Sequence, residues 1–548
     1  MNHPTHLSRR RAVQAAIATA AAVSIPAGQA TAGEATPATG ANIAQGPTRQ
    51  QVAAAVGMLD SWIASTMTRT GVPGMAVAVV FDDEVLYERG FGMREVGGTD
   101  PVTVDTVFQL ASMSKAISST VMAAVVGDGT TTWDTVAADA LPGFALSDPW
   151  LSAQVSLRDL FSHRSGLPAY AGDTLIATFG YGRDETVRRL RLVEPATPIR
   201  TAFAYTNVGL SVAGFAAAAS AGTDWEDLAE SRLLAPLGMD QTSYRNADYL
   251  ARANRAEPHY RKVDGSWATG LVTNGDPMSP AGGVSASVHD LTRWVRMQLG
   301  EGVLDGKEIV ARAALMETRR PQILESSPAN PADGPATFYG LGWFLTHDDL
   351  GRLRVYHIGD FSDGFRTSVN LLPGSRLGIV ALTNAWPNPL PDAVPRTFFE
   401  MVERGEPSQD WITYFASQTD AGLEAVRRAA PFPQTAQPGH DPALPLESYV
   451  GTFANTLYGT IATRIKDGGL VLEFGPGPAQ LSLSHWSRDV FTYDLPPTGA
   501  VLIGEKLGVQ FRIGPTGTAS ELAFGLPSVG PEGTAVFTRI EPGTPGAS

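Results

Sequence analysis

The 548-residue sequence contains no cysteine. This absence excludes disulfides, thiolate catalysis and a lipid-modified cysteine. Histidines are few as well: the nine are scattered without the paired spacing of a zinc site, so we expect neither a metal nor a cofactor. A basic surplus is also lacking, because the formal net charge is −14. That charge argues against nucleic acid and anionic membrane surfaces as partners.

An apolar run long enough to span a bilayer is absent too. Near the N-terminus, Ser8-Arg9-Arg10-Arg11 is followed by a short apolar stretch and then by Ala30-Thr31-Ala32, the pattern of a twin-arginine export signal. We expect residues 1–32 to be this signal, cleaved after Ala32, and residues 33–48 to be a flexible leader. The mature protein is then periplasmic or secreted and has no integral membrane segment.

Residues 49–428 have the pattern of an α+β domain. Helical spacing over Val52–Met67 is followed by a buried strand from Val72 to Val80 and a return strand at 85–87. Strands come back late, at 353–357, 366–372 and 377–383, after a long and mostly helical stretch. The sheet is therefore expected to pair segments that lie far apart in the sequence.

The pattern changes near the C-terminus. Residues 429–445 are proline-rich and predict a semi-rigid linker. In residues 446–541, about eight short strands separated by turn residues indicate a closed antiparallel barrel, followed by a tail at 542–548. The strands expected there include 460–466, 470–474, 480–483, 490–494, 501–503, 509–513 and 535–540.

The stretch Ser112-Met113-Ser114-Lys115 has the residues for nucleophilic catalysis. Small and apolar residues with helical spacing follow it, so Ser112 is expected at the start of a buried helix. Lys115 lies one turn further on, where its amine reaches the Ser112 hydroxyl. A lysine whose pKa is lowered by burial can remove the serine proton. Alone this pattern is weak, since Ser-x-x-Lys more often lies on a solvated helix face.

A second motif is Tyr205-Thr206-Asn207, expected in an extended loop that points Tyr205 and Asn207 to the same side. Tyr205 could carry a proton between the nucleophile and the leaving group. Asn207 could bind the substrate carbonyl or orient Lys115. Taken alone, Tyr-x-Asn is usually part of a surface loop.

A third motif, His357-Ile358-Gly359-Asp360, ends an apolar strand. The His357 imidazole could face a substrate, and Gly359 would let a ligand approach the backbone. The amide after the glycine could donate to an oxyanion. The alternative is a half-buried strand histidine. For another histidine, His163, we favour a structural role that ties a loop to its helix.

In the order Ser-x-x-Lys, Tyr-x-Asn, His-x-Gly, these motifs resemble those of the penicillin-recognising serine hydrolases, in the class C β-lactamase-like branch. This branch includes D,D-peptidases, D-aminopeptidases, family VIII esterases and lipocalin-tailed peptidases. The resemblance covers about Gln50 to Pro387, and Tyr449-Val450-Gly451-Thr452-Phe453 is similar to the start of the lipocalin-like tail. It implies a β-lactamase/transpeptidase-like domain, with an antiparallel sheet and a helical region, and a C-terminal lipocalin-like β-barrel.

The resemblance also implies roles for the motif residues. Ser112 would form the acyl-enzyme, and Lys115 would be the general base, alone or with Tyr205. Tyr205 would protonate the leaving group and later activate water. The substrate-binding residues would be Asn207, His357, Gly359 and Asp360, with the backbone N–H groups of Ser112 and Asp360 as the oxyanion hole.

Two positions depart from the branch. His357 stands where β-lactamases carry the lysine of Lys-Thr-Gly, and an imidazole at neutral pH is often uncharged. Asp360 replaces the usual Gly, Ser or Ala, and Asp363 follows closely. An acidic cleft edge suits a neutral or cationic substrate better than an anionic one, so efficient β-lactamase activity is the least favoured activity.

We therefore expect an exported serine hydrolase that cleaves a small peptide or amide substrate, such as a peptide with D- or unusual residues, of which linearised microcystin is one example. One alternative is a carboxylesterase that uses the same residues. Another is a non-catalytic protein that binds peptidoglycan or peptides, although the intact Ser112, Lys115 and Tyr205 argue against it. The barrel is expected to stabilise the protein or to join copies into a homo-oligomer; the other interpretation is that it covers the active-site mouth and limits substrate length.

Overall fold

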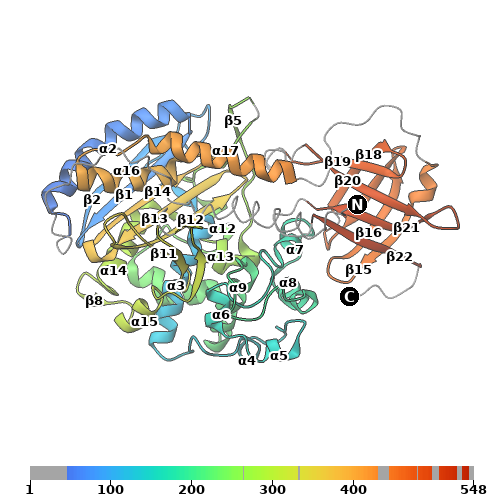
Figure 1. Cartoon of the computed structure of the whole chain (residues 1–548), viewed down its shortest axis with the longest axis horizontal. Coiled ribbons are helices and arrows are strands. Elements are labelled where there is room, and N and C mark those ends of the chain that lie inside the picture. Colours follow the sequence, from blue (N-terminus) through green and yellow to red (C-terminus); the bar gives the residue numbers. More distant parts are fainter. Residues whose placement is uncertain are drawn as a thin grey trace.

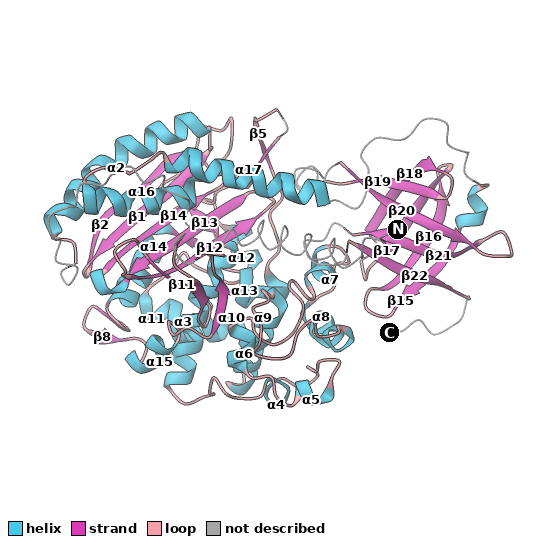
Figure 2. Ribbon diagram, viewed as in Figure 1, coloured by secondary structure: helices cyan, strands magenta, loops and turns pink. Residues whose placement is uncertain are grey.

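The computed structural model describes residues 46–262, 264–330, 334–429, 444–477, 479–496, 505–526 and 533–541. The expected export signal, residues 33–45 of the leader, residues 430–443 of the linker, the strand at 501–503 and the tail at 542–548 lie outside these residues. Figures 1 and 2 show an α+β domain and a separate barrel. No helix within the described ranges is both long and apolar enough to cross a membrane.

An eight-stranded antiparallel sheet forms the centre of the larger domain, in the order β2-β1-β14-β13-β12-β11-β10-β9. Its first strand in the sequence pairs with its last, with Met75 opposite Thr383, so the sheet joins distant segments as predicted. The bounds are β1 Gly74–Phe81, β2 Glu84–Gly92, β9 Ile323–Ser326, β10 Thr337–Tyr339, β11 Phe344–His347, β12 Leu353–Phe361, β13 Phe365–Leu372 and β14 Leu377–Thr383.

Helices cover both faces of this sheet (Figure 2). Alternate residues of β1 accordingly belong to two different hydrophobic cores, one on each face. Val77 and Val79 pack with helices α2 (Arg49–Thr70), α16 (Leu390–Arg404) and α17 (Trp411–Ala429). Ala76 and Ala78 belong to the core that holds α3 (Ser114–Gly127) and α14 (Val288–Leu299). Every residue of β1 is therefore buried.

The helical region between the early and late strands contains the remaining helices and short two-stranded pairs. The helices are α4 Ala137–Ala140, α5 Pro149–Ser152, α6 Leu157–Phe161, α7 Asp173–Ala177, α8 Arg183–Arg189, α9 Asn207–Ser220, α10 Trp225–Ala229, α11 Ala235–Leu237, α12 Asn246–Ala251, α13 Ser279–Gly282 and α15 Arg312–Glu317. The strands are β3 Val107–Gln109, β4 His259–Arg261, β5 Trp267–Thr269, β6 Ser285–Ser287, β7 Val303–Leu304 and β8 Lys307–Glu308. Helix α3 lies at the centre of this region, since nearly all its residues are buried.

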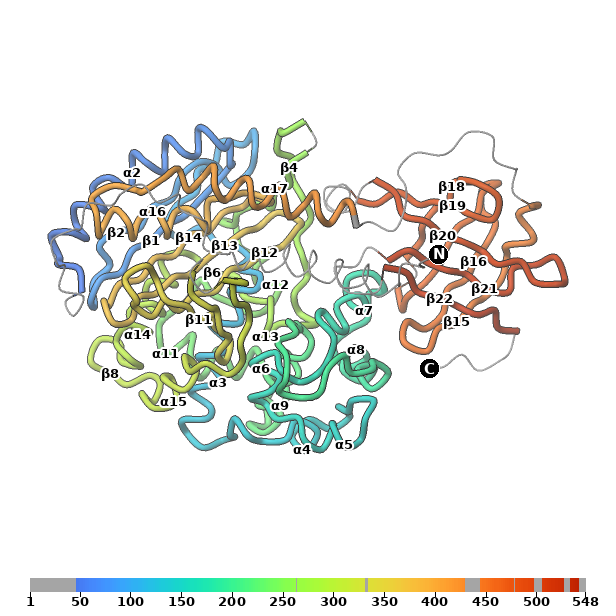
Figure 3. Tube along the Cα trace, viewed as in Figure 1, coloured from blue at the N-terminus to red at the C-terminus, as the bar shows by residue number. Residues whose placement is uncertain are grey.

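The C-terminal part is a closed antiparallel barrel, as predicted, in which β15 pairs with β22. Its strands are β15 Gly451–Asn455, β16 Gly459–Lys466, β17 Gly469–Phe474, β18 Ala479–Ser487, β19 Val490–Asp494, β20 Lys506–Ile513, β21 Ala519–Gly525 and β22 Thr534–Ile540. The barrel has its own apolar core, and two residues of the larger domain, Leu175 and Phe179, belong to that core. The trace in Figure 3 shows α7 and α8 on the side of the larger domain that faces the barrel.

Candidate active site

Ser112 lies in a sharp turn at the start of α3. A 3-10 turn, Ala111–Met113, leads directly into the helix, as the helical spacing predicted. Ala111 has a φ of 49°, a left-handed conformation that is uncommon for a residue with a side chain. Ser112 is half-buried, whereas its two neighbours, Ala111 and Met113, are buried. The turn therefore leaves the hydroxyl of Ser112 accessible at the edge of a packed core.

Lys115 is fully buried, and its amine has three hydrogen-bond partners. Its Nζ lies 3.0 Å from the Oγ of Ser112, 2.6 Å from Oδ1 of Asn207 and 2.9 Å from the carbonyl oxygen of Ala281. Burial lowers the pKa of Lys115 to about 7, although the nearby carboxyl of Asp173 acts in the opposite direction. A large fraction of this amine is therefore neutral near pH 7 and able to accept a proton.

Tyr205 contacts both the serine hydroxyl and the lysine amine. The Nζ of Lys115 is 4.7 Å from the centroid of the tyrosine ring, and the phenol is hydrogen-bonded to Ser112. Burial, reinforced by Tyr339, raises the pKa of Tyr205 well above its usual value and outweighs the hydrogen bond with Ser112. The phenol is therefore protonated at neutral pH, which makes it a proton donor rather than a base.

Asn207 does not lie in an extended loop, which corrects the prediction for this motif. Thr206 is the extended residue before α9, and Asn207 is the first residue of that helix. Its Oδ1 accepts from Lys115, and its Nδ2 donates to Oδ2 of Asp173 at 2.6 Å. Of the two predicted roles, the contacts match the orientation of Lys115; binding of a substrate carbonyl stays a prediction.

Asp173 is a residue of the site that sequence reasoning missed. It begins α7, a helix whose first residue follows a glycine with a φ of 91°. No sequence motif marks Asp173. Its contact with Asn207 joins two residues that are 34 positions apart in the sequence and meet only in the folded chain. Burial raises the pKa of this carboxyl to about 7, against the effects of Asn207 and Lys115.

Gly359 brings strand β12 against the serine turn. A Cβ at this position would lie 2.0 Å from the carbonyl oxygen of Leu110 and 2.9 Å from the backbone nitrogen of Met113. The hydroxyl of Thr367 on β13 donates to the same carbonyl of Leu110 at 2.7 Å. The close backbone approach at Gly359 is therefore made by the chain's own serine turn, whereas the sequence suggested a ligand; a substrate contact there stays a prediction.

His357 lies in an aromatic cluster with Tyr339 and Phe344 and is 1% exposed. Its Nε2 is 3.0 Å from the hydroxyl of Tyr339, and its Nδ1 is 2.7 Å from the carbonyl oxygen of Ile358. Burial, helped by the charge of Lys115, lowers the pKa of His357 to about 3, so the ring is neutral. Both ring nitrogens already have partners, and a direct contact with substrate stays a prediction.

Asp360 is neutralised in part by an arginine. Its Oδ1 lies 3.4 Å from Nε of Arg366, whose Nη2 is 2.7 Å from Asp392. Burial raises the pKa of Asp360 to about 6, against the effect of Arg366. The cleft edge is therefore less acidic than Asp360 and Asp363 alone suggested.

His163 has the structural role that was predicted for it. Its backbone has a φ of 57°, and its Nδ1 accepts a hydrogen bond of 3.2 Å from the backbone N–H of Thr206. The ring lies 4.5 Å from that of Tyr205 and 4.8 Å from that of Tyr339, measured between centroids. His163 thus supports the loop that presents Tyr205.

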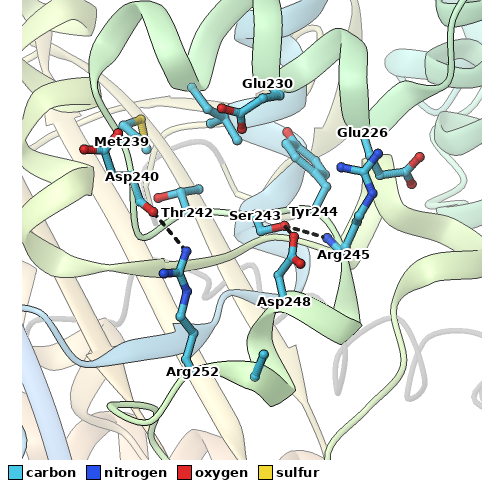
Figure 4. A pocket seen from close by; sticks show the side chains of 12 residues that line it. Glu226, Glu230, Met239, Asp240, Thr242, Ser243, Tyr244, Arg245, Asp248 and Arg252 are labelled. Atoms are coloured by element: carbon cyan, nitrogen blue, oxygen red, sulfur yellow. Dashed lines mark hydrogen bonds between the residues drawn. The ribbon is translucent and has the colours of Figure 1, made fainter.

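A hollow of about 510 Å³ lies elsewhere on the domain (Figure 4), and none of its lining residues belongs to the group around Ser112. Its polar groups hold one another: Ser243 Oγ donates to Asp248 at 2.6 Å, and Arg252 donates to the carbonyl of Asp240 at 2.9 Å. Glu226 pairs with Arg183 at 2.6 Å.

Over the described part of the chain, no group of three or more His, Asp or Glu side chains is arranged to hold a metal ion.

The chain is similar in sequence and in fold to several known proteins. A family model described as Beta-lactamase matches residues 59–398, and one described as Domain of unknown function (DUF3471) matches residues 435–534. "Unguisins hydrolase ungD'" of Aspergillus campestris is 26% identical over 507 residues, which are 86% of this chain and 89% of the relative. "Penicillin-binding protein 4" of Amycolatopsis lactamdurans is 32% identical over 325 residues, 58% of this chain and 82% of the relative. The octameric penicillin-binding protein homologue from Pyrococcus abyssi has a similar fold, with a TM-score of 0.56 at 18% identity, covering 88% of this chain and 100% of that one.

Proposed function

The chain belongs to the β-lactamase family of serine hydrolases, and on that basis we propose that it is an exported peptidase or amidase that acts through an acyl-enzyme on Ser112. One observation carries the proposal: a fully buried lysine amine lies 3.0 Å from the Ser112 hydroxyl, and its pKa is lowered to about 7. An amine that is neutral at working pH is the base that a serine nucleophile needs.

The reaction follows from these positions. Lys115 takes the proton of Ser112 as Oγ forms a bond to the substrate carbonyl carbon, and the backbone amides of Ser112 and Asp360 stabilise the oxyanion. The C–N bond then breaks, and the protonated phenol of Tyr205 donates to the leaving amine while it receives the proton that Lys115 holds. Water attacks the acyl-enzyme by the same route, giving the acid and free Ser112.

Two features favour a peptide or amide over a β-lactam. His357 is neutral, so it offers no positive charge to a β-lactam carboxylate at the position where β-lactamases carry a lysine. The relative named Unguisins hydrolase also matches along 86% of this chain and 89% of its own length. We propose peptides with D- or unusual residues as the substrate class, with linearised microcystin as one test compound.

The test compares wild type, Ser112→Ala and a control, Ser61→Ala, whose hydroxyl is exposed on α2. The substrates are D- and L-aminoacyl anilides, linearised microcystin, p-nitrophenyl butyrate and fluorescent penicillin, with intact-protein mass spectrometry to detect the acyl adduct. We expect anilide or peptide turnover that survives Ser61→Ala and falls by about 10³-fold or more in Ser112→Ala. Turnover of esters alone would make the protein an esterase, and activity that survives Ser112→Ala would refute the mechanism.

A further inference from the structure

One short segment of the larger domain joins the barrel to the candidate active site. It runs from Asp173, the first residue of α7, to Tyr181. Phe179 near its end is 1% exposed and belongs to the barrel core together with Leu175. The ring of Phe179 stacks on that of Tyr458 at 5.0 Å and lies 5.5 Å from that of Phe474, measured between centroids. The segment therefore enters the barrel with a side chain and does not merely touch its outer surface.

The barrel is shaped to receive this segment. A Cβ at Gly475 would lie 2.2 Å from the carbonyl oxygen of Phe179, so only glycine leaves room for the backbone to approach. Around this contact, the Tyr181 hydroxyl donates to the carbonyl of Tyr458 at 3.1 Å, and Arg189 of α8 donates to the carbonyl of Leu457 at 2.7 Å. Apolar insertion and hydrogen bonds together fix the segment against the barrel.

The other end of the segment lies in the active site. Oδ2 of Asp173 accepts from Nδ2 of Asn207 at 2.6 Å, and Oδ1 of Asn207 accepts from Lys115 at 2.6 Å. The second oxygen of Asp173, Oδ1, is buried and has no hydrogen-bond partner among the described residues. Leaving an oxygen of the carboxyl group buried in this way is unfavourable for stability, which indicates a role other than packing.

Asp173 is the main source of negative charge among the ionisable groups around Lys115. They are Asp173 from α7, Tyr205 before α9, His163 after α6 and His357 on β12. Tyr205 is protonated at neutral pH, and burial keeps both histidines neutral. Tyr170, whose pKa is also raised by burial, faces Asp173.

We propose that Asp173 is a positioning residue that orients Asn207 and sets the charge of Lys115, and that the barrel holds Asp173 in place by enclosing Phe179. The inference rests on the proposed function of Ser112 and Lys115. It gives the barrel a part in the chemistry although no barrel residue contacts the serine or the lysine among the described contacts.

The test measures the pKa of Lys115 directly, so it does not depend on turnover. Protein enriched in ¹³C at lysine Cε is titrated by NMR, and the Lys115 signal is assigned by its loss in Lys115→Arg. Asp173→Asn keeps an acceptor for Asn207, removes the charge and replaces the second oxygen by an NH2 group. We expect the pKa of Lys115 to fall by about half a unit or more in Asp173→Asn, because an anion within reach favours the ammonium form. An unchanged pKa would overturn the electrostatic role of Asp173.

The contribution of the barrel is tested with Phe179→Ala and Gly475→Ala. The control is Gly517→Ala, since Gly517 lies in a barrel turn with the same left-handed conformation as Gly475 but with open space where a Cβ would be. We expect Phe179→Ala and Gly475→Ala to lower the pKa of Lys115, as Asp173→Asn does. The pKa in the Gly517→Ala control should match that of the wild type. Where anilide turnover is established, the first two variants also lower kcat by up to about 10²-fold with KM less affected, because the catalytic groups are misplaced. Phe179→Ala and Gly475→Ala that keep the wild-type pKa would overturn the role of the barrel.

Discussion

The identity of the base is decided at the scale of single residues. Lys115 and Tyr205 both contact Ser112, but burial acts on them in opposite ways. It lowers the pKa of the amine to about 7 and raises the pKa of the phenol, because in each case the uncharged form is favoured. A neutral amine is a base and a neutral phenol is an acid, so one physical cause supports both proposed roles.

This assignment predicts the dependence of activity on pH. A lysine is neutral above its pKa, so kcat/KM for a neutral anilide is expected to rise about 10-fold per pH unit below about 7 and to level off above it. Lys115→Arg keeps a charged group at all accessible pH values, since the guanidinium pKa exceeds about 12, and is expected to lose about 10²–10⁴-fold in kcat/KM. Rates measured from pH 5 to 9 check both, and a flat profile in wild type would contradict the role of Lys115.

At the scale of elements, the contact between β12 and the serine turn supports Ser112, the proposed nucleophile. Strand β12 approaches the turn at Gly359 so closely that backbone atoms of the two elements fill the place of a side chain. Thr367 on the neighbouring strand donates to the same turn. The sheet thus supports the left-handed backbone at Ala111 that presents Ser112.

Gly359→Ala should therefore separate the strand from the turn. We expect a loss of about 1–3 kcal/mol in the free energy of unfolding, as for overpacking of a core, and a fall in kcat larger than any change in KM. Gly374→Ala is the matched control, because a Cβ at Gly374 meets nothing within 4 Å. Denaturant unfolding and steady-state kinetics on both variants measure the effects; equal behaviour of the two variants would show that the close approach is unimportant.

At the scale of the whole molecule, the chain has separate apolar cores. Among the described residues, one large core lies on each face of the sheet and a separate core fills the barrel, with Leu175 and Phe179 as its buried members from the larger domain. Domains with separate cores unfold as separate cooperative units. The barrel should therefore have a transition of its own.

Phe511→Ala tests this expectation. Phe511 is 2% exposed in the barrel core and packs against Tyr449, Phe453 and Phe491. Its truncation is expected to destabilise the barrel by about 3–5 kcal/mol, and calorimetry should show one transition lowered and the other little changed. Val536→Ala, at a position that is 53% exposed, should change stability by less than about 0.5 kcal/mol. A single transition that moves as a whole would contradict the separation.

The sequence by itself determined much of the architecture and the central pair of the site. The spacing of apolar residues is a local property, so the helix at 52–67, the strands β1, β12, β13 and β14 and most of the described barrel strands could be predicted from it, although β21 was not. Ser112 and Lys115 are one helical turn apart, so their contact also follows from local geometry. The resemblance of three motifs then indicated the family, which the match over residues 59–398 confirms.

Only the tertiary structure decided what depends on contacts between distant segments. Asp173 approaches Asn207 across 34 residues, and Gly359 meets Leu110, because the sheet and helices bring these backbones together. The sequence prediction placed Asn207 in an extended loop, which was wrong, because Asn207 begins helix α9. A two-residue spacing does not distinguish a loop from a helix N-terminus. The insertion of Phe179 into the barrel has no sequence signal, because an apolar side chain in a helical region predicts burial but does not say in which core.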